Sequence, residues 1–155
     1  MKVIIRRGTE NDFPSVLGLI KELADFEKAP QQVINTVDKM VQEQEYFDFF
    51  VAEVNGAIVG MALYFFAYYT WVGKSLYLDD IYVKREFRSK KIGTKLLREI
   101  FKVAREKKCN RIRWQVLNWN KEAIRFYKKI NARIDDGWLN CDFGQQEISS
   151  FLNTF

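Results

Sequence analysis

The stretch from Leu76 to Leu97 indicates a β-strand, a short basic turn and the beginning of an amphipathic helix. Apolar residues alternate through most of the strand, and after Gly93 they recur at helical spacing. The helical set is Ile92, Leu96, Leu97, Ile100, Phe101 and Ala104. A strand that enters a helix through such a turn leaves free N–H groups at the helix N-terminus, where anions bind. The sequence therefore predicts an anion site in front of this helix.

Positive charge is concentrated around this turn. Residues 84–108 contain eleven Lys or Arg and three Glu, whereas the whole chain of 155 residues carries a net charge of only +5. The residues alone leave open a phosphate-binding turn or a solvated basic helix face. A nucleic-acid-binding module is a further alternative. We do not expect a nucleic acid partner, because the basic residues are not interleaved with aromatic residues on a sheet face.

Composition limits the chemistry. The length and the 48% apolar content predict one domain, residues 1–155, with a core over 1–143 and a tail over 144–155. Histidine is absent, which excludes Ser-His-Asp and Cys-His machinery and the common zinc centres. We expect no metal, and proton transfer must use Asp, Glu, Tyr, Lys, Cys or water.

The sequence predicts a cytoplasmic protein that does not span a membrane. Residues 1–7 contain too few apolar positions for a signal peptide. Residues 54–73 carry no charge and are long enough to span a bilayer, but Asn55 and Gly56 form a hairpin-turn dipeptide. The remainder of that stretch suits a buried strand. Cys109 and Cys141 are isolated thiols without metal or redox spacing, which favours a reducing compartment.

The rest of the chain alternates between strand and helix signals. Strands are expected over 2–7, 49–54, 57–68, 111–117, 132–134 and 138–143. Helices are expected up to Phe26 after a cap at Thr9 or Asp12, from a cap at Asn35 or Thr36 to about Glu45, and after a cap at Asn120. In the tail, Ile148, Phe151, Leu152 and Phe155 have helical spacing, as in a docking helix or one that seeks a partner. This order predicts an α+β fold with a mostly antiparallel sheet.

The turn resembles the acetyl-CoA-binding signature R/Q-x-x-G-x-G/A of the GCN5-related N-acetyltransferases, the GNAT family. Arg88 and Gly93 match the ends of the pattern, whereas Lys91 stands where its first glycine is expected and Ser89 replaces another frequent glycine. Either the turn is less tightly wound, or Lys91 adds a phosphate contact in place of flexibility. The order of elements is also that of the family, which implies a GNAT-like mixed, mostly antiparallel sheet flanked by helices.

Several short strings resemble one branch, the diamine (spermidine/spermine) and thialysine N-acetyltransferases. They lie at 19–27, 71–74, 76–80, 119–120, 126–129 and 137–138. The resemblance implies transfer of an acetyl group from acetyl-CoA to a primary amine of a polyamine or a lysine-like amino acid. A protein lysine or N-terminus is the alternative substrate. The resemblance to this branch also implies a homodimer whose subunits share C-terminal elements.

The resemblance assigns cofactor contacts by position. Pantetheine would pair with the backbone of Ile81, Tyr82 and Val83, as another strand would. The pyrophosphate would meet the turn, with further contacts after the next strand and at the next helix N-terminus. These remaining cofactor residues are Arg88, Ser89, Lys90, Lys91, Ile92, Gly93, Thr94, Arg113, Trp114, Gln115, Asn120, Lys121, Glu122 and Ala123.

The resemblance also assigns catalytic and substrate-binding roles. Tyr127 would donate a proton to the departing CoA thiolate, and Asp79, where the family usually has Glu, would help to deprotonate the amine. An acidic, aromatic-lined substrate groove would comprise Phe26, Glu27, Trp71, Asp79, Asp136 and Trp138. Tyr69 stands where similar diamine enzymes have aspartate. Without the resemblance, the residues alone favour Tyr127 as a helix residue with a buried ring, and they favour each acid as an ordinary strand-end or solvent-facing residue.

Overall fold

A computed structural model describes residues 1–154, which fall into two compact units that meet in sequence between Gln115 and Val116. The first unit contains β1 (Val3–Arg7), α1 (Phe13–Phe26), α2 (Val37–Gln42), β2 (Asp48–Val54), β3 (Ala57–Tyr69), β4 (Gly73–Val83), α3 (Ile92–Glu106) and β5 (Arg111–Arg113). Single 3-10 turns cover Glu10–Asp12, Pro30–Gln32, Gln44–Tyr46 and Arg85–Phe87. The second unit contains α4 (Lys121–Lys129) and α5 (Gln145–Thr154).

The strands form one sheet in the order β1-β2-β3-β4-β5. Pairs from β1 to β4 are antiparallel, and β5 runs parallel to β4. The return from β4 to a parallel β5 passes through α3, because a parallel neighbour needs a crossover connection. The predicted α+β class with a mixed, mostly antiparallel sheet is confirmed.

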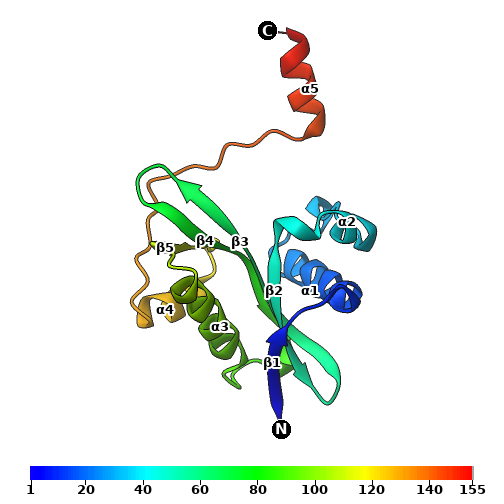
Figure 1. Ribbon diagram of the computed structural model, residues 1–155, viewed down its shortest axis with the longest axis vertical. Coiled ribbons are helices and arrows are strands. Elements are labelled where there is room, and N and C mark those ends of the chain that lie inside the picture. The colour runs from blue at the N-terminus through cyan, green and yellow to red at the C-terminus, as the bar shows by residue number, and fades with distance from the viewer. Residues whose placement is uncertain (155) are drawn as a thin grey trace. The chain divides into compact units, whose positions relative to one another are not determined.

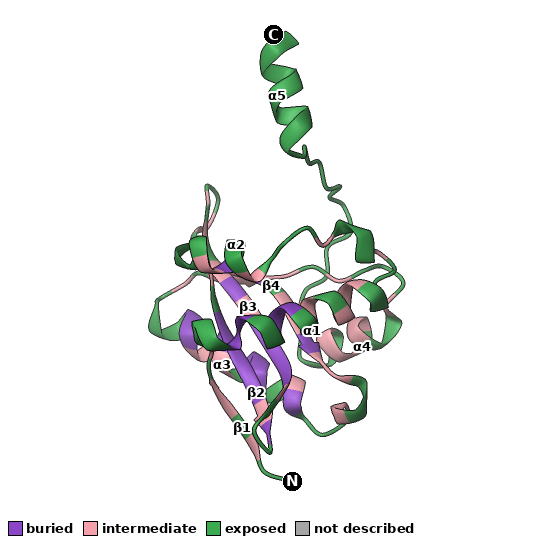
Figure 2. Ribbon diagram, turned by 90° about the vertical axis from the view of Figure 1, so that its right-hand side faces the viewer, coloured by how far each residue is buried: buried purple, intermediate pink, exposed green. Residues whose placement is uncertain are grey.

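Helices cover both faces of this sheet. In Figure 1, α1 and α2 lie on one side and α3 on the other. The cluster beneath α1 includes Phe13, Val16, Leu19, Met40, Val51, Met61 and Tyr82. Figure 2 shows the buried residues running along the central strands. Burying each large apolar side chain contributes roughly 1.5–3 kcal/mol, so these two layers provide much of the stability of the first unit.

A β-bulge interrupts β4. Leu78 pairs with Tyr64 and Asp80 pairs with Leu63, so Asp79 is an extra residue without a partner in β3. Leu63 packs against the cluster beneath α1, whereas its neighbour Tyr64 must face the other side of the sheet. The bulge therefore turns Asp80 toward the α1 face, although Leu78 points to the α3 face.

Two predicted helix starts are confirmed in detail. The Thr36 side chain accepts a hydrogen bond from the Lys39 N–H at 3.2 Å, and the Asn120 side chain accepts one from the Ala123 N–H at 3.2 Å. Each cap satisfies an N–H that the first helical turn cannot pair internally. The helix expected to reach about Glu45 ends at Gln42 and is followed by a 3-10 turn.

Three predicted strands differ. β5 ends at Arg113 instead of Leu117, and residues 132–134 and 138–143 form no strand. Alternating apolar residues form a strand only beside another strand that takes up their backbone hydrogen bonds. Among the described residues, none of these segments has such a neighbour beyond Arg113. Nearly all of residues 132–143 are exposed, and a turn at Gly137 is held by the Asp135 carboxylate.

The tail forms a helix, as its spacing predicts. α5 carries Ile148, Phe151 and Leu152, all exposed, and Phe155 lies outside the described residues. Within residues 1–154, no helix combines the length and apolar character needed to cross a bilayer.

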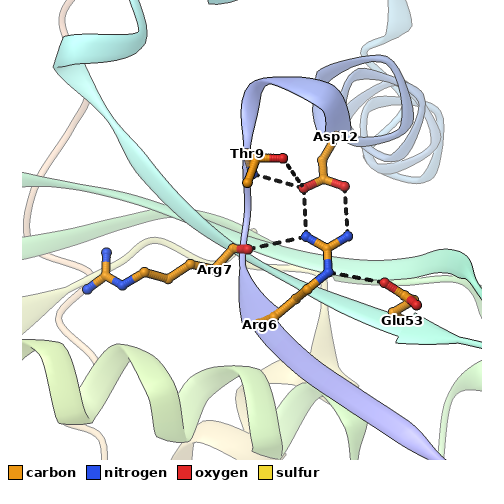
Figure 3. A network of polar contacts seen from close by, with 5 residues as sticks. All are labelled: Arg6, Arg7, Thr9, Asp12 and Glu53. Carbon is orange, nitrogen blue, oxygen red and sulfur yellow. Dashed lines mark hydrogen bonds and ion pairs between the residues drawn. The ribbon is translucent and has the colours of Figure 1, made fainter.

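A partly buried ion pair joins the first strand to the first helix (Figure 3). Arg6 donates two hydrogen bonds to the Asp12 carboxylate, at 2.8 and 2.9 Å, and a third to Glu53 at 3.1 Å. The Thr9 N–H and hydroxyl also donate to Asp12. The hydrogen bonds from Arg6 and Thr9 hold the pKa of Asp12 at about 2 despite its burial. Asp12 thereby fixes the entry into α1.

Asp12→Asn should lower the free energy of unfolding by about 2 kcal/mol at neutral pH, because the folded state loses its preference for the ionised carboxylate. The folded-state pKa lies below the ordinary 3.8, so this stabilisation is present above that value and is lost as the pH falls toward 2. Urea unfolding at several pH values measures both effects. Asp48→Asn is the control, since the exposed Arg7–Asp48 pair is 4.0 Å apart and should contribute less than about 0.5 kcal/mol. Equal losses in both variants would contradict this assignment.

Candidate active site

Three carboxylates gather where α1 ends beside the bulge of β4. Asp80 is half-buried, and Asp79 and Glu27 are exposed. Burial, together with the negative charges of Asp79 and Glu27, raises the pKa of Asp80 to about 7. Burial also raises the pKa of Asp79 and of Glu27. A group of this kind attracts a cation and accepts a proton near neutral pH.

Asp80 is the residue of this group that the sequence did not single out. The Asp79-Asp80 pair is visible in the sequence, but alternation would place the two side chains on opposite faces of a regular strand. The bulge changes that expectation, because the two successive residues at a bulge both oppose one residue of the partner strand. No residue pattern in β4 predicts the bulge. Only the pairing with β3 shows it.

Beyond Tyr77, β4 has an open edge. β5 pairs with Ser75, Leu76 and Tyr77 only, so the strand is unpaired on that side from Leu78 to Val83 within the first unit. The Lys84 N–H donates to the Val59 carbonyl of β3. Because antiparallel bonding alternates, Tyr82 also directs its backbone to β3, whereas Ile81 and Val83 direct theirs to the open edge. An extended ligand with amide groups could pair with Ile81 and with the N–H of Val83, whose carbonyl already accepts a hydrogen bond from Arg88.

The basic turn is wound through left-handed residues. Ser89 has φ +60° and Lys91 has φ +60°, ψ 17°, and α3 begins at Ile92. Left-handed backbone costs a residue with a side chain roughly 1–2 kcal/mol, which explains why glycine is frequent in such turns. The turn thus keeps the tight geometry that a glycine would adopt, despite the lysine side chain. The N–H groups of the first turn of α3, from Ile92 to Thr94, have no acceptor within the helix.

Space is available beside Gly93. A Cβ built on this residue would touch only the Val83 side chain, at 4.0 Å. The fold itself therefore does not require glycine at this position. Because Gly93 has no side chain, a ligand can approach the N-terminus of α3 closely. A helix N-terminus favours a bound anion.

Arg88 links the turn to both α1 and β4. Its Nε donates to the Val83 carbonyl at 3.0 Å, and its guanidinium lies 5.3 Å from the Phe26 ring and 5.4 Å from the Tyr82 ring. These contacts give the Arg88 side chain a structural role. Lys90 lies over the Phe87 ring and donates to the Glu86 carbonyl. The structure therefore brings together Phe26, Tyr82 and Arg88 from the predicted set.

A second charged group lies at the far end of the same sheet face. The guanidinium groups of Arg111 and Arg113 lie 4.2 and 5.2 Å from the centre of the Tyr69 ring. Next to them, Phe65 and Tyr77 stack at 5.1 Å. Trp71 follows β3 and is almost fully exposed. Tyr69 therefore contacts cations of the protein itself, at the position where the resembling diamine enzymes have an acid.

The second unit carries the remaining predicted residues. Tyr127 lies in α4, and burial raises the pKa of its phenol. Asn120 caps this helix, and Lys121, Glu122 and Ala123 form its first turn. Asp136 and Trp138 follow in the exposed segment, where the Trp138 Nε1–H donates to Asp135 at 3.2 Å. Trp114 and Gln115 come directly after β5, at the end of the first unit.

Comparison with known proteins agrees with these features. The model of the acetyltransferase (GNAT) family matches residues 17–132. The thialysine N-epsilon-acetyltransferase of Sus scrofa is 38% identical over 91% of this chain and 92% of its own length. A human spermidine/spermine N(1)-acetyltransferase-like protein is 30% identical over 93% of this chain, which spans 23% of that protein. A predicted acetyltransferase of Clostridium acetobutylicum, solved with acetyl-CoA, has a TM-score of 0.74 at 18% identity, covering 91% of this chain and 96% of its own.

Proposed function

Because the chain belongs to the acetyltransferase (GNAT) family, we propose that it transfers the acetyl group of acetyl-CoA to a primary amine of a small cationic substrate. The observation that carries this proposal is the open edge of β4 beside the tight turn that leads into α3. The edge offers strand-like pairing to a chain with amide groups, and the turn offers N–H groups to phosphate. Coenzyme A contains both, joined in that order.

The cofactor lies along β4 in this proposal. The backbone of Ile81 and Val83 pairs with the pantetheine amides, and the turn from Ser89 to Thr94 holds the pyrophosphate. Lys90 and Lys91 are exposed cations at the turn and neutralise part of the phosphate charge. The Arg88 side chain supports the turn through Val83, since its Nε bond is already directed there. Residues 113–115 and 120–123 supply the remaining contacts that the family resemblance implies.

The carboxylates beside the bulge hold and deprotonate the amine. A primary amine has a reference pKa of about 10.4, so it arrives as an ammonium ion and must lose a proton before it attacks the thioester. We assign this task to Asp79 and Asp80, directly or through water, with Glu27 adding negative charge. Phe26, at the end of α1, offers an aromatic face to the cation, whereas Trp71 follows β3 away from the bulge.

Tyr127 completes the reaction in this proposal. After the amine attacks, the tetrahedral intermediate expels the CoA thiolate, which takes a proton from the Tyr127 phenol. A phenol with a raised pKa is fully protonated at neutral pH and can serve as this donor. Asp136 and Trp138 would add an acid and an aromatic face for the substrate. We also infer that the whole chain works as one acetyltransferase domain, since the family match runs from the first unit into the second.

An amine panel tests the function. With acetyl-CoA and spermidine, thialysine, lysine or a basic peptide, the chain should release free thiol with at least one small amine. Tyr127→Phe should lower kcat by about 100-fold, within the range for lost acid catalysis, while CoA binding measured by calorimetry stays within about threefold. Thiol release by no amine, or an unchanged kcat in Tyr127→Phe, would refute the proposal or the role of Tyr127.

The pH dependence tests the carboxylates. Since the pKa of Asp80 is about 7 and the ionised form accepts the proton, kcat/KM for the amine should rise with pH through about 7. Asp80→Asn should remove this rise. Asp79→Asn should move it to lower pH, because the Asp79 charge no longer raises the pKa of Asp80. Asp25→Asn, an exposed acid on α1, should leave the profile unchanged. A rise that persists in Asp80→Asn would exclude this carboxylate.

We further propose a homodimer assembled through the C-terminal segment. Leu139, Phe143 and Leu152 expose 91%, 64% and 73% of their surface, and the strands predicted over 132–134 and 138–143 find no neighbouring strand within residues 1–154. A second copy could supply that neighbour. Sedimentation velocity should show a dimer that Leu152→Glu weakens at least tenfold, whereas Ser149→Glu on the same helix should not. A monomeric wild-type chain would overturn the proposal.

We assign the protein to the cytoplasm. Cys109 and Cys141 are free thiols, and Cys141 is exposed. Exposed free thiols suit a reducing compartment. The proposed function also requires acetyl-CoA in the same compartment.

A further inference from the structure

The outward face of α3 carries a line of positive charge. Its cations follow one another at spacings of three, four and three residues, which keeps them within about 80° of the helix circumference. They form the cationic stripe, which consists of Lys95, Arg98, Lys102 and Arg105. The opposite side of α3 faces the sheet (Figure 1) and is apolar, with the buried residues Leu96, Leu97, Ile100 and Val103. The stripe therefore faces solvent along most of the helix.

Most of this charge is not neutralised by the protein. Lys102 forms an ion pair with Glu99 at 2.7 Å. Lys95, Arg98 and Arg105 are exposed, and none of them forms an ion pair with an Asp or Glu of residues 1–154. Like charges three or four residues apart repel one another and destabilise a helix. Folding therefore gives no reason for the stripe, whereas an anion that approaches from solvent is attracted to it.

The stripe begins beside the proposed phosphate site. Lys95 directly follows the turn from Ser89 to Thr94, which holds the pyrophosphate in the proposed function. Along the axis of α3, Lys95 and Arg98 lie about 5 and 9 Å from Ile92, and Arg105 lies about 20 Å from it. The Debye length is about 10 Å at 0.1 M salt. At this salt concentration Lys95 and Arg98 attract an anion that approaches the turn, whereas the charge of Arg105 is largely screened.

The charge distribution of coenzyme A matches this field. The pyrophosphate and the 3′-phosphate together carry about four negative charges at neutral pH, all at one end of the molecule, and the thioester end is neutral. The carboxylates of Asp79, Asp80 and Glu27 lie toward the other end of the open edge of β4, where they repel phosphate and attract an ammonium ion. The first unit therefore presents opposite charges at the two ends of this edge.

From this arrangement, which rests on the proposed function, we infer that Lys95 and Arg98 steer acetyl-CoA to the turn and orient it before contact. The phosphates are drawn to the α3 end, so the pantetheine arm points along β4 toward the bulge. The reverse orientation places the phosphates beside the carboxylates, where like charges repel. Steering of this kind raises the rate of association, because charges that act over a distance increase the number of productive encounters. Neither Lys95 nor Arg98 touches the bound cofactor in this inference.

Association rates test the inference. The fluorescent 1,N6-etheno derivative of CoA, which keeps all three phosphate groups, is mixed with the full chain by stopped flow at about 0.1 M salt. The double variant Lys95→Gln, Arg98→Gln should lower the association rate constant about fivefold, while the dissociation rate constant stays within about twofold. Arg105→Gln is the matched control and should change the association rate constant by less than about 1.5-fold, because its charge is screened from the turn. Gln has nearly the helix propensity of Lys and Arg, so α3 is preserved in each variant.

Salt and a second ligand separate steering from direct contact. At about 1 M salt, where the Debye length is about 3 Å, the wild-type chain and the double variant should associate at rates within about twofold of each other. With the etheno derivative of dephospho-CoA, which lacks the 3′-phosphate and thus about half of the charge, the difference at low salt should shrink to about twofold but persist. A difference confined to the ligand with the 3′-phosphate, or one that appears in the dissociation rate, would indicate a direct phosphate contact and would overturn steering.

Two further outcomes would contradict the inference. Equal association rates for the wild-type chain and the double variant at low salt would overturn it and leave the proposed function intact. An equal loss per removed charge in Arg105→Gln would show that only the net charge matters, and would also overturn it. If the wild-type chain bound no CoA at all, the proposed function would be refuted, and the inference with it. Circular dichroism melting of each variant keeps a folding defect from being read as a loss of steering.

Discussion

The pairing of β4 is the constraint on which the rest of the structure depends. On one side the strand is paired with β3 along most of its length, and on the other it is paired only as far as Tyr77. The first side holds the strand rigidly in the sheet, and the second leaves backbone groups of Ile81 and Val83 directed outward. A strand that is fixed on one edge and open on the other can bind an extended ligand without losing further backbone conformational entropy, because the strand is already ordered.

The bulge and the turn act on the two ends of this open edge. At Asp79 the bulge turns Asp80 to the α1 face, where burial and the charges of Asp79 and Glu27 raise its pKa. Beyond Val83, the left-handed residues Ser89 and Lys91 return the chain into α3, so that the helix N-terminus lies close to the strand. Arg88 joins the two ends, because it bonds the Val83 carbonyl and stacks on Phe26 at the end of α1. The carboxylates, the strand edge and the tight turn therefore lie along one continuous stretch of chain, from Asp79 to Thr94.

The sequence predicted features that depend on neighbouring residues, such as helix caps. It did not predict which strands would pair. Thr36 and Asn120 cap helices because capping depends on residues only three apart, which the sequence shows directly. The strand expected over 111–117 ends at Arg113, and the segments 132–134 and 138–143 are irregular. A strand also needs a neighbouring strand to take up its backbone hydrogen bonds, and alternation in the sequence does not identify that neighbour. Asp80 was missed for the same reason: its side chain changes face only through the unequal pairing of β4 with β3. The contact of Arg111 and Arg113 with the Tyr69 ring gave no signal either, since that ring lies more than forty positions earlier in the chain.

Charge separation along the α1 face follows from the same pairing. If β4 had no bulge, Asp80 would face α3, and the acids would not share a surface with Arg111 and Arg113. With the bulge, one face carries carboxylates near α1 and guanidinium groups near Tyr69, with the phenol of Tyr77 between them. A uniformly acidic groove would attract any polyamine, because each additional ammonium ion adds a favourable contact. On a surface that carries both signs, a second ammonium ion gains nothing from the guanidinium end. In the proposed function the amine lies at the acidic end, beside Asp79 and Asp80, where it can lose its proton before it attacks the thioester.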